Sequence, residues 1–354
     1  MKLSANKILV MRYRFIGDTV LTVPFLRNLR NSFPEARIDL MVEPFSGQVL
    51  EGCPYVDRII PFEFKTIHTY SSRSTRGKLG AFQHYWSLIR REGYDAAFVL
   101  KRSLSSAALV FAAGVSRRIG FATEGRGLLL TDRVPYRHDQ HEVENFLDCL
   151  RCLDVPVTSK GLELWPLPEH ERNVQERFTR KGWAQDDLKV VIHAAASLPA
   201  KMWPLDRFAR VMKHLQDRYH AKFIYTGSGN DSAFYKDIER QGTFSGLNLC
   251  GTTSLRENIA AYKACDLFFG VDSGPMHMAA AAGIPVVALF GPTDERKWGP
   301  WGSGHVIISK RLACHPCKPH KCGNNECMTQ ITANDAITTL DTRITEIRSG
   351  TVTR

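Results

Sequence analysis

Residues suited to binding an anion follow one of the most apolar segments of the chain. The run Asp272-Ser273-Gly274-Pro275 ends a strand-like stretch and opens a helix with a face of small residues. Pro275 suits the first helical turn, and Asp272 or Ser273 can cap it. The free N–H groups of such a helix end carry about half a unit of positive charge and favour a phosphate. His277 lies in the same turn and can point toward the anion, although simple helix capping explains the pattern too.

Three further strand ends in the same half of the chain carry residues that suit a bound nucleotide. The next strand-like run ends in Gly291-Pro292-Thr293, and two adjacent turns of this kind suggest a diphosphate between them. Upstream, Ser197 and Lys201 precede a Trp-Pro helix start, where a lysine can act as a point charge on a phosphate or remain a surface residue. Gly227 lies in a tight turn that permits close approach of a base or ribose.

A carboxylate stands in the first half of the chain where an anion would usually bind. Gly17-Asp18 lies between the apolar run 8–11, typical of a buried strand, and a segment with helical periodicity. We expect the helix to begin just after Asp18 and to be kinked by Pro24. In nucleotide-binding α/β proteins this turn normally receives a phosphate. Asp18 therefore has a role other than binding a phosphate, and capping the helix is the simplest such role.

Four of the nine cysteines are clustered near the C-terminus. Cys314, Cys317, Cys322 and Cys327 have the spacing C-x2-C-x4-C-x4-C. Four thiolates this close can hold a tetrahedral zinc ion, so the spacing predicts a structural zinc site. Free thiols, an iron–sulfur cluster or a disulfide are the alternatives, and a disulfide is disfavoured in the cytoplasm.

The elements that must position these residues alternate between strand and helix. Alternation of this kind indicates βαβ units, parallel sheets and ligand binding at the carboxyl ends of the strands. The expected strands of the first half are 7–11, 37–42, 58–61, 96–100 and 117–121. Those of the second half are 189–193, 222–226, 247–250, 266–271 and 285–290.

Length and composition favour two globular domains. With 354 residues, 44% hydrophobic and 23% charged, the chain exceeds one ordinary core. The proline-containing segment 162–172 lacks periodicity and is the expected linker. We therefore predict a first doubly wound domain over 1–165 and a second over 166–354, the latter with the cysteine cluster and a final helix.

Charge and hydropathy constrain the partners. The net charge is +11, and residues 65–91 carry six basic side chains without an acidic one. Such a run is either a solvated face or a patch that meets an anionic surface. No window offers about 20 uninterrupted apolar residues, and 8–11 is too short for a signal peptide. We expect a cytoplasmic protein.

The chain resembles glycosyltransferase family nine, the ADP-heptose:lipopolysaccharide heptosyltransferases. The resemblance rests on RYRFIGDTVLTVPFLRNLRNSFP, AKMWP and VDSGPMHMAAAAGIPVVALFGPTD, and it runs over essentially the whole chain. It implies a GT-B fold, in which two Rossmann-like doubly wound domains face a central cleft. It also implies that the C-terminal domain holds ADP-heptose and that L-glycero-D-manno-heptose is transferred with inversion to the lipopolysaccharide inner core.

The resemblance assigns roles to the residues singled out above. Asp18 matches the proposed catalytic base, and Gly17 lets the acceptor approach. Lys201 matches the lysine that neutralises the donor phosphates, and Asp272 the acid that orients the heptose hydroxyls. The positions beside the diphosphate are Ser273, Gly274, His277, Gly291, Pro292 and Thr293. Relatives often carry hydroxyl or glycine residues where 194–196 is Ala-Ala-Ala, so Ser197 substitutes for them.

The implied acceptor is lipid A–Kdo or a heptosylated core at the inner face of the inner membrane. The run 65–91 is then expected to meet its phosphates and carboxylates, and no cofactor is required for the chemistry. Another nucleotide-sugar-dependent GT-B enzyme is the first alternative. A nicotinamide-dependent oxidoreductase is disfavoured because G-x-G-x-x-G is absent after the first strand. A nucleic-acid binder is disfavoured because basic residues are not concentrated around the cysteine cluster.

Overall fold

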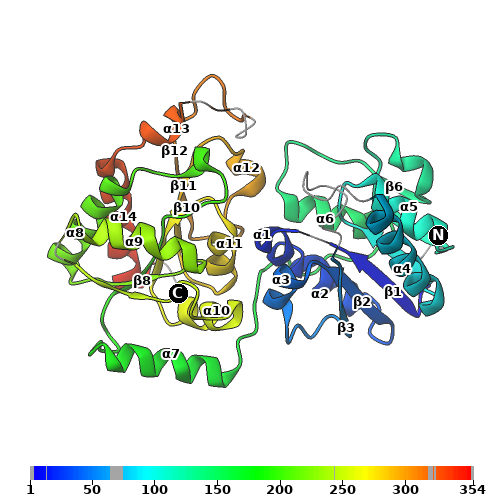
Figure 1. Ribbon diagram of the computed structural model, residues 1–354, viewed down its shortest axis with the longest axis horizontal. Helices are drawn as coiled ribbons and strands as arrows, with labels where there is room; N and C mark the ends of the chain where they lie inside the picture. The colour runs from blue at the N-terminus through cyan, green and yellow to red at the C-terminus, as the bar shows by residue number, and fades with distance from the viewer. Residues whose placement is uncertain are drawn as a thin grey trace. The chain divides into compact units, whose positions relative to one another are not determined.

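The computed structural model describes residues 4–12, 14–63, 75–242, 244–317, 322 and 324–351, with the backbone alone for 75–79. The chain divides into two compact units, Met1–Lys160 and Gly161–Arg354, whereas the predicted boundary lay after residue 165. Figure 1 shows that each unit contains a sheet with helices around it. Each unit is described by itself below.

Unit 1 is built on a six-stranded parallel sheet with the order β3-β2-β1-β4-β5-β6. Apolar residues fill both faces of its central strands, because helices cover a parallel sheet on both sides. The strands are β1 (Lys7–Met11), β2 (Arg37–Val42), β3 (Arg58–Pro61), β4 (Ala96–Val99), β5 (Arg117–Phe121) and β6 (Asp132–Val134). The short strand β6 was not predicted.

Two groups of helices cover the sheet of unit 1. α4 (Thr75–Glu92) packs on α5 (Leu104–Ala112), and α2 (Val23–Ser32) packs on α6 (Glu142–Arg151). Side chains along one strand alternate between two layers, so that Leu9 and Met11 join the core beneath α4 and α5. The smaller elements are α1 (Ile16–Val20), α3 (Pro44–Gly47), η1 (Gln48–Leu50) and η2 (Arg126–Leu129).

The segment around Asp18 differs from its prediction. The helix α1 begins at Ile16, so that Asp18 lies in its first turn and is not its N-cap. The predicted single helix is two helices, and Pro24 occupies the first turn of α2, where its missing N–H is not needed. Before α1, Arg14 and Phe15 have φ values of 73° and 65°, in the left-handed region that costs non-glycine residues energy.

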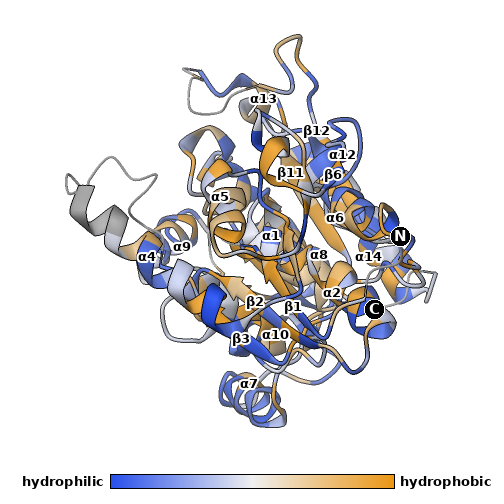
Figure 2. Cartoon of the chain, turned by 90° about the vertical axis from the view of Figure 1, so that its right-hand side faces the viewer, coloured by the Kyte–Doolittle hydropathy of each residue, from blue (hydrophilic) through white to orange (hydrophobic). Residues whose placement is uncertain are grey.

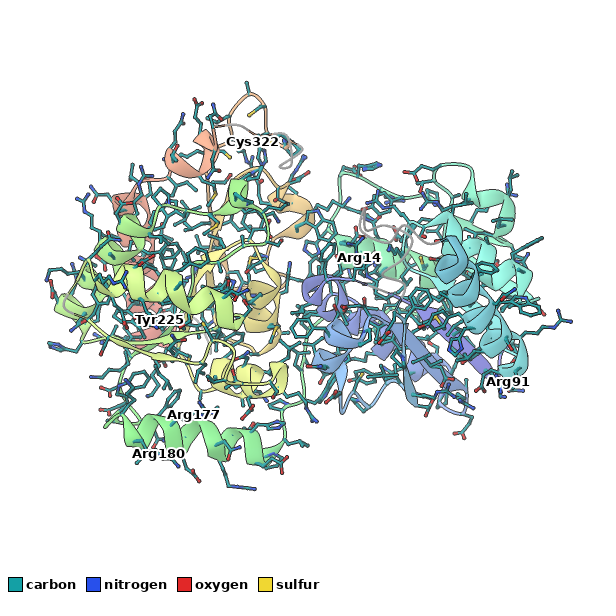
Figure 3. The ribbon with its side chains drawn as sticks, viewed as in Figure 1. Arg14, Arg91, Arg177, Arg180, Tyr225 and Cys322 are labelled. Atoms are coloured by element: carbon teal, nitrogen blue, oxygen red, sulfur yellow. The ribbon has the colours of Figure 1, made fainter. Side chains whose placement is uncertain are left out.

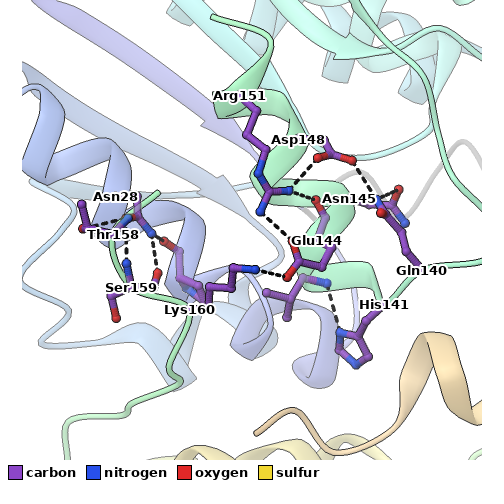
Figure 4. A network of polar contacts seen from close by, with 12 residues as sticks. Asn28, Gln140, His141, Glu144, Asn145, Asp148, Arg151, Thr158, Ser159 and Lys160 are labelled. Atoms are coloured by element: carbon purple, nitrogen blue, oxygen red, sulfur yellow. Dashed lines mark hydrogen bonds and ion pairs between the residues drawn. The ribbon is translucent and has the colours of Figure 1, made fainter. Parts of the chain in front are cut away.

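A polar network ties the end of unit 1 to its own helices (Figure 4). The Asn28 side-chain oxygen accepts a hydrogen bond from the Thr158 backbone N–H at 2.7 Å, and its amide donates to the Ser159 carbonyl at 2.6 Å. Lys160 pairs with Glu144 of α6 at 2.7 Å. These contacts anchor the chain immediately before it enters unit 2.

Unit 2 repeats the plan of unit 1, with the strand order β12-β11-β10-β7-β8-β9 and parallel pairing throughout. Numbered within its own unit, each sheet has the order 3-2-1-4-5-6 of the Rossmann fold. The strands are β7 (Lys189–His193), β8 (Lys222–Tyr225), β9 (Gly246–Asn248), β10 (Leu267–Val271), β11 (Val286–Phe290) and β12 (Val306–Ser309). β12 was not predicted.

The helices of unit 2 also lie in two groups. α8 (Leu205–Tyr219) packs against α9 (Ser232–Glu239) and α14 (Ala333–Arg348) over one core, while α10 (Leu255–Lys263) packs against α7 (Pro168–Arg180) and α11 (Gly274–Ala281). Figure 2 shows α7 largely in hydrophilic colours and β11 in hydrophobic ones. The short elements are η3 (Pro199–Lys201), η4 (Gly229–Asp231), α12 (Glu295–Trp298) and α13 (Glu326–Thr329). Within the described residues, no helix is long and apolar enough to cross a membrane.

Candidate active site

The switch point of unit 1 lies between β1 and β4, where the strand order reverses. Ligands of open α/β sheets bind at the carboxyl ends of the strands at this place. Arg12 directly follows β1 and continues its ladder, since its N–H donates to the Met41 carbonyl at 2.9 Å. Asp18 follows on α1, and Lys101 comes shortly after the end of β4. Three charged side chains are therefore delivered to one edge of the sheet.

Asp18 forms a nearly buried ion pair with Arg12. The distance from Asp18 Oδ2 to Arg12 Nη2 is 2.5 Å, and the two side chains are 12% and 7% exposed. Burial raises the pKa of Asp18 above its ordinary value, the Arg12 charge opposes this shift, and the charge of Glu142 adds to it. A carboxylate in this environment holds a proton more readily than an exposed one, which suits a group that must accept one.

A second layer of polar contacts lies behind the pair. Glu142, only 4% exposed, accepts a hydrogen bond from the Tyr136 hydroxyl at 2.6 Å. The guanidinium of Arg102 lies 4.1 Å from the centre of the Tyr136 ring, and that of Arg12 lies 5.2 Å from the centre of the Phe146 ring. The orientation of Arg12, and through it of Asp18, is thus constrained by α6.

Basic groups surround this switch point. Burial and the charges of Arg14 and Arg12 lower the pKa of Lys101 to about 8, with Asp18 opposing the shift. Arg126 is 2% exposed and pairs with Glu124, while its Nε and Nη1 make no hydrogen bond within the described part of the chain. Arg14 lies two positions before the first residue of α1 (Figure 3). Positive charge gathered beside a carboxylate favours an anionic ligand.

The switch point of unit 2 lies between β7 and β10, and it brings two predicted site residues together. Lys201 Nζ lies 2.6 Å from Asp272 Oδ2, with the side chains 19% and 7% exposed. Lys201 ends η3 after β7, and Asp272 directly follows β10. The two residues are 71 positions apart in the sequence. They meet because β7 and β10 are neighbouring parallel strands, in which Gly270 pairs with His193, so both strands end at the same edge of the sheet.

The helix N-terminus beside this pair begins where the sequence predicted, but no side chain caps it. Ser273 is the N-cap residue of α11, but its hydroxyl donates to the Val271 carbonyl at 3.1 Å and does not cap the helix. Gly274 begins the helix and Pro275 lies in its first turn. His277 is in the same turn and is 5% exposed. The first N–H groups of α11 are therefore not capped by Ser273 and are suited to an anion.

The flanking turns lie at the same edge of the sheet. Gly291-Pro292-Thr293 follows β11, and the Asp272 N–H donates to the Leu289 carbonyl of that strand at 3.2 Å. Thr293 Oγ1 is buried and has no hydrogen-bond partner among the described residues. On the other side Gly227 follows β8, and a Cβ on it would lie 2.6 Å from Asp231 Oδ2. Ser197 is exposed in the loop after β7.

The cysteine segment contacts the turn after β11. The Cys317 N–H donates to the Pro292 carbonyl at 3.0 Å, and His315 Nε2 lies 3.0 Å from the Thr293 carbonyl oxygen. None of the nine cysteines, which all lie in the described part of the chain, forms a disulfide; Cys314 is exposed and Cys327 is buried. Burial raises the pKa of Cys317 and of Cys327, and in each case the other cysteines of the cluster add to the shift. The thiols thus lie within electrostatic range of one another.

Several charged residues of unit 1 were not singled out from the sequence. Arg12, Lys101 and Arg102 each follow a predicted strand. The sequence did not give the order of these strands in the sheet, and without that order the three residues could not be assigned to one edge. Glu142 had no motif to mark it. Of the predicted basic run, Lys65 and Arg73 lie outside the described residues, as do the side chains of Arg76 and Lys78.

Two Rossmann-type units, each with charged residues at its switch point, define a GT-B protein. Solved structures agree with this fold. The glycosyl transferase family 9 protein of Veillonella parvula superimposes with a TM-score of 0.82 at 22% identity, covering 98% of this chain and 99% of that one. An Escherichia coli heptosyltransferase with ADP-2-deoxy-2-fluoro heptose gives 0.70 at 19% identity, covering 95% and 99%.

The sequence pattern of glycosyltransferase family 9 (heptosyltransferase) matches residues 83–328. The chain belongs to this family. Lipopolysaccharide heptosyltransferase 2 of Escherichia coli K12 is 29% identical over 301 residues, which are 81% of this chain and 83% of the relative. The predictions of a GT-B fold and of glycosyltransferase activity are confirmed, and the oxidoreductase alternative is set aside.

Proposed function

We propose that this chain transfers L-glycero-D-manno-heptose from ADP-heptose to the lipopolysaccharide inner core, with inversion at the anomeric carbon. The donor proposal is supported by the phosphate-compatible edge of unit 2 and by the names of the similar proteins. The acceptor is lipid A–Kdo or a heptosylated core. Its phosphates and carboxylates fit the positive charge around Asp18 in unit 1.

The observation that carries this proposal is the nearly buried Asp18–Arg12 pair at the switch point of unit 1. Asp18 takes the proton from the acceptor hydroxyl while that oxygen forms a bond to the anomeric carbon. The bond from this carbon to the β-phosphate oxygen breaks at the same time, and ADP leaves. Gly17, buried beside Asp18 on α1, keeps side-chain bulk away from the reacting groups.

Negative charge develops on the departing diphosphate and has to be balanced in unit 2. Lys201 supplies a positive charge, and the N-terminus of α11 at Ser273 and Gly274 supplies N–H groups. Asp272 orients the sugar hydroxyls and holds Lys201 in place before the donor binds. His277, Ser197, Gly227 and the turn of Gly291, Pro292 and Thr293 complete the donor site.

Lysine and a helix terminus stabilise the leaving group in this mechanism, so no cofactor is required for the chemistry. The protein acts in the cytoplasm as a peripheral protein at the inner face of the inner membrane, where a lipid-linked acceptor presents its sugars. No nucleic acid takes part.

The test is transfer from ADP-heptose to acceptors of defined core length by the Asp18→Asn variant. We expect turnover to fall about 10²–10⁴-fold, the range of general-base catalysis, with little change in the Kd for ADP. The control is Asp132→Asn, which removes a carboxylate from another Arg–Asp pair of unit 1, at 2.7 Å from Arg117. Turnover of Asp18→Asn equal to that of the control would remove Asp18 from the mechanism.

The Lys201→Ala variant tests the donor half. We expect both a weaker Kd for ADP and a lower turnover, because the lysine acts on the bound diphosphate and on the leaving group. Lys213→Ala is the control, since Lys213 forms an exposed pair with Asp217 on α8. An unchanged ADP affinity contradicts the assigned role, and transfer from another nucleotide sugar but not from ADP-heptose contradicts the donor.

A further inference from the structure

Helix α5 of unit 1 exposes apolar side chains where a surface helix normally places charged ones. Leu104 is 57% exposed and Phe111 is 50% exposed. Ala108 and Ala112 complete the i, i+4, i+7 and i+8 spacing of one helical face, and none of the nine residues of α5 is charged. The opposite side of the helix, which includes Ala107, packs into the core of unit 1. Both sides of α5 are therefore apolar, and the described residues cover only one of them.

The short helix η2 extends this apolar face. It packs against α5, and its Leu128 side chain is 80% exposed. Arg118 of β5 connects the two elements, because its guanidinium donates to the Leu129 carbonyl at 2.8 Å and lies 5.3 Å from the centre of the Phe111 ring. One exposed apolar side chain is ordinary on a protein surface, whereas several that adjoin one another mark an interaction site.

A tryptophan and two arginines border the face. α4 lies beside α5 (Figure 1), and Trp86 Nε1 donates to the Ala112 carbonyl at 3.0 Å. The Arg90 guanidinium lies 5.4 Å from the centre of the Trp86 ring. Among the residues that the structure describes, no acidic side chain forms an ion pair with Arg90 or Arg118. Tryptophan and arginine beside an apolar face are typical of proteins that lie at a membrane–water interface.

A second copy of this chain is the alternative partner for an apolar face. A two-fold contact would place the same surface of each copy together and bring the arginines of both copies close to one another, which costs free energy. An anionic bilayer instead offers phosphates to the arginines and acyl chains to the apolar side chains. α5 also begins three residues after Lys101, so the face starts beside the edge of unit 1 where the acceptor is proposed to react. Charge and position therefore both favour a bilayer.

We propose that this face is a membrane-docking surface of unit 1, called the α5 surface, which binds bilayers that contain anionic phospholipid. It consists of an apolar part and a rim, which are Leu104, Phe111 and Leu128, and Trp86, Arg90 and Arg118. The apolar side chains enter the head-group region, and the two arginines contact lipid phosphates. The choice of a bilayer rests on the function proposed above, whose acceptor is lipid-linked, whereas the apolar face itself does not.

The first test is flotation of the full-length protein at low salt with vesicles of phosphatidylcholine and phosphatidylglycerol. We expect Phe111→Ser/Leu128→Ser to weaken the binding about tenfold, because two apolar side chains no longer leave water, and Leu128→Ser alone to weaken it about threefold. Both side chains are at least half exposed, so the variants should unfold near the wild-type temperature. Phe45→Ser is the control, since Phe45 is 54% exposed on α3, which packs against α1, η1 and β3. Binding by the double variant that equals that of the control overturns the α5 surface.

The second test separates the bilayer from a second copy of the chain and from the reaction itself. We expect the wild type and Phe111→Ser/Leu128→Ser to sediment with the same mass over a range of protein concentrations. A dimer that the double variant loses assigns the face to a second copy and overturns the bilayer. The double variant should transfer heptose at the wild-type rate to an acceptor without acyl chains, and a loss there overturns a role confined to docking. Wild-type protein that binds the vesicles but transfers no heptose contradicts the proposed function and leaves the α5 surface intact.

Discussion

Arg12 has two effects on the carboxylate that it holds. It keeps Asp18 oriented at 2.5 Å, and its charge favours the ionised form against the cost of burial. A general base has to be unprotonated before it can act, so the counter-ion extends the pH range in which Asp18 is competent. Because Arg12 is itself fixed by the backbone bond to Met41 and by the Phe146 ring, we infer that it is a positioning residue.

Replacing Arg12 by Met should therefore change the pH dependence of the enzyme. Loss of the Arg12 charge removes the largest effect that opposes burial, so the pKa of Asp18 rises further. As the pH falls, Asp18 is then protonated at a higher pH than in the wild type. We expect the acidic limb of kcat/KM to move to higher pH, with an intermediate position for Arg12→Lys. Arg117→Met, which breaks the pair with Asp132, is the control for general destabilisation. An acidic limb that stays in place in Arg12→Met contradicts this role.

At the scale of elements, the donor edge depends on how closely β7 and β10 approach. Gly270 pairs with His193, and a Cβ on Gly270 would lie 2.4 Å from the His193 carbonyl oxygen. Backbone contact of this kind cannot be relieved by a side-chain rotation. The strands carry Lys201 and Asp272 beyond their carboxyl ends, so any separation of the strands displaces that ion pair.

We accordingly expect Gly270→Ala to lower the free energy of unfolding by about 1–3 kcal/mol and to weaken ADP binding. Thermal unfolding and calorimetric titration with ADP measure the two effects. Gly80→Ala is the matched control, because Gly80 lies in α4 with no atom within 4 Å of the added Cβ. A helical Gly→Ala change at such a site is neutral or slightly stabilising. Wild-type stability and affinity in Gly270→Ala would refute the close-packing argument.

Periodicity predicted most strands and helices of both units because their apolar residues face helices or sheets in a regular pattern. It failed where the backbone is irregular. The left-handed conformations of Arg14 and Phe15 let α1 begin at Ile16, and no residue type there signals such a turn. The start of α11 at Gly274 was predictable, since the preference of proline for the first helical turn is local. The Asp18–Arg12 pair was not, because tertiary packing decides which charge a carboxylate meets.

For the whole molecule, a net charge of +11 is a property that no single residue accounts for. A positive surface attracts anionic membranes over about one Debye length, roughly 8 Å at physiological salt. The lipid-linked acceptor proposed here requires the enzyme to work at such a surface. Arg90 and Arg91 lie in the last turn of α4 of unit 1, within the basic run, whereas Arg177 and Arg180 lie on α7 of unit 2. Figure 3 labels Arg91, Arg177 and Arg180.

These two arginine pairs allow the peripheral association to be tested at equal net charge. We expect the protein to float with vesicles that contain anionic phospholipid, to remain unbound with phosphatidylcholine alone, and to be released by about 0.5 M salt. Arg90→Ala/Arg91→Ala should weaken the binding about 30-fold, since each of the two basic residues near the surface contributes about 1 kcal/mol. Arg177→Ala/Arg180→Ala removes the same charge from unit 2 and should bind almost as the wild type does. Equal losses in both variants would mean that net charge alone, and not an acceptor-side patch of unit 1, brings the enzyme to the membrane.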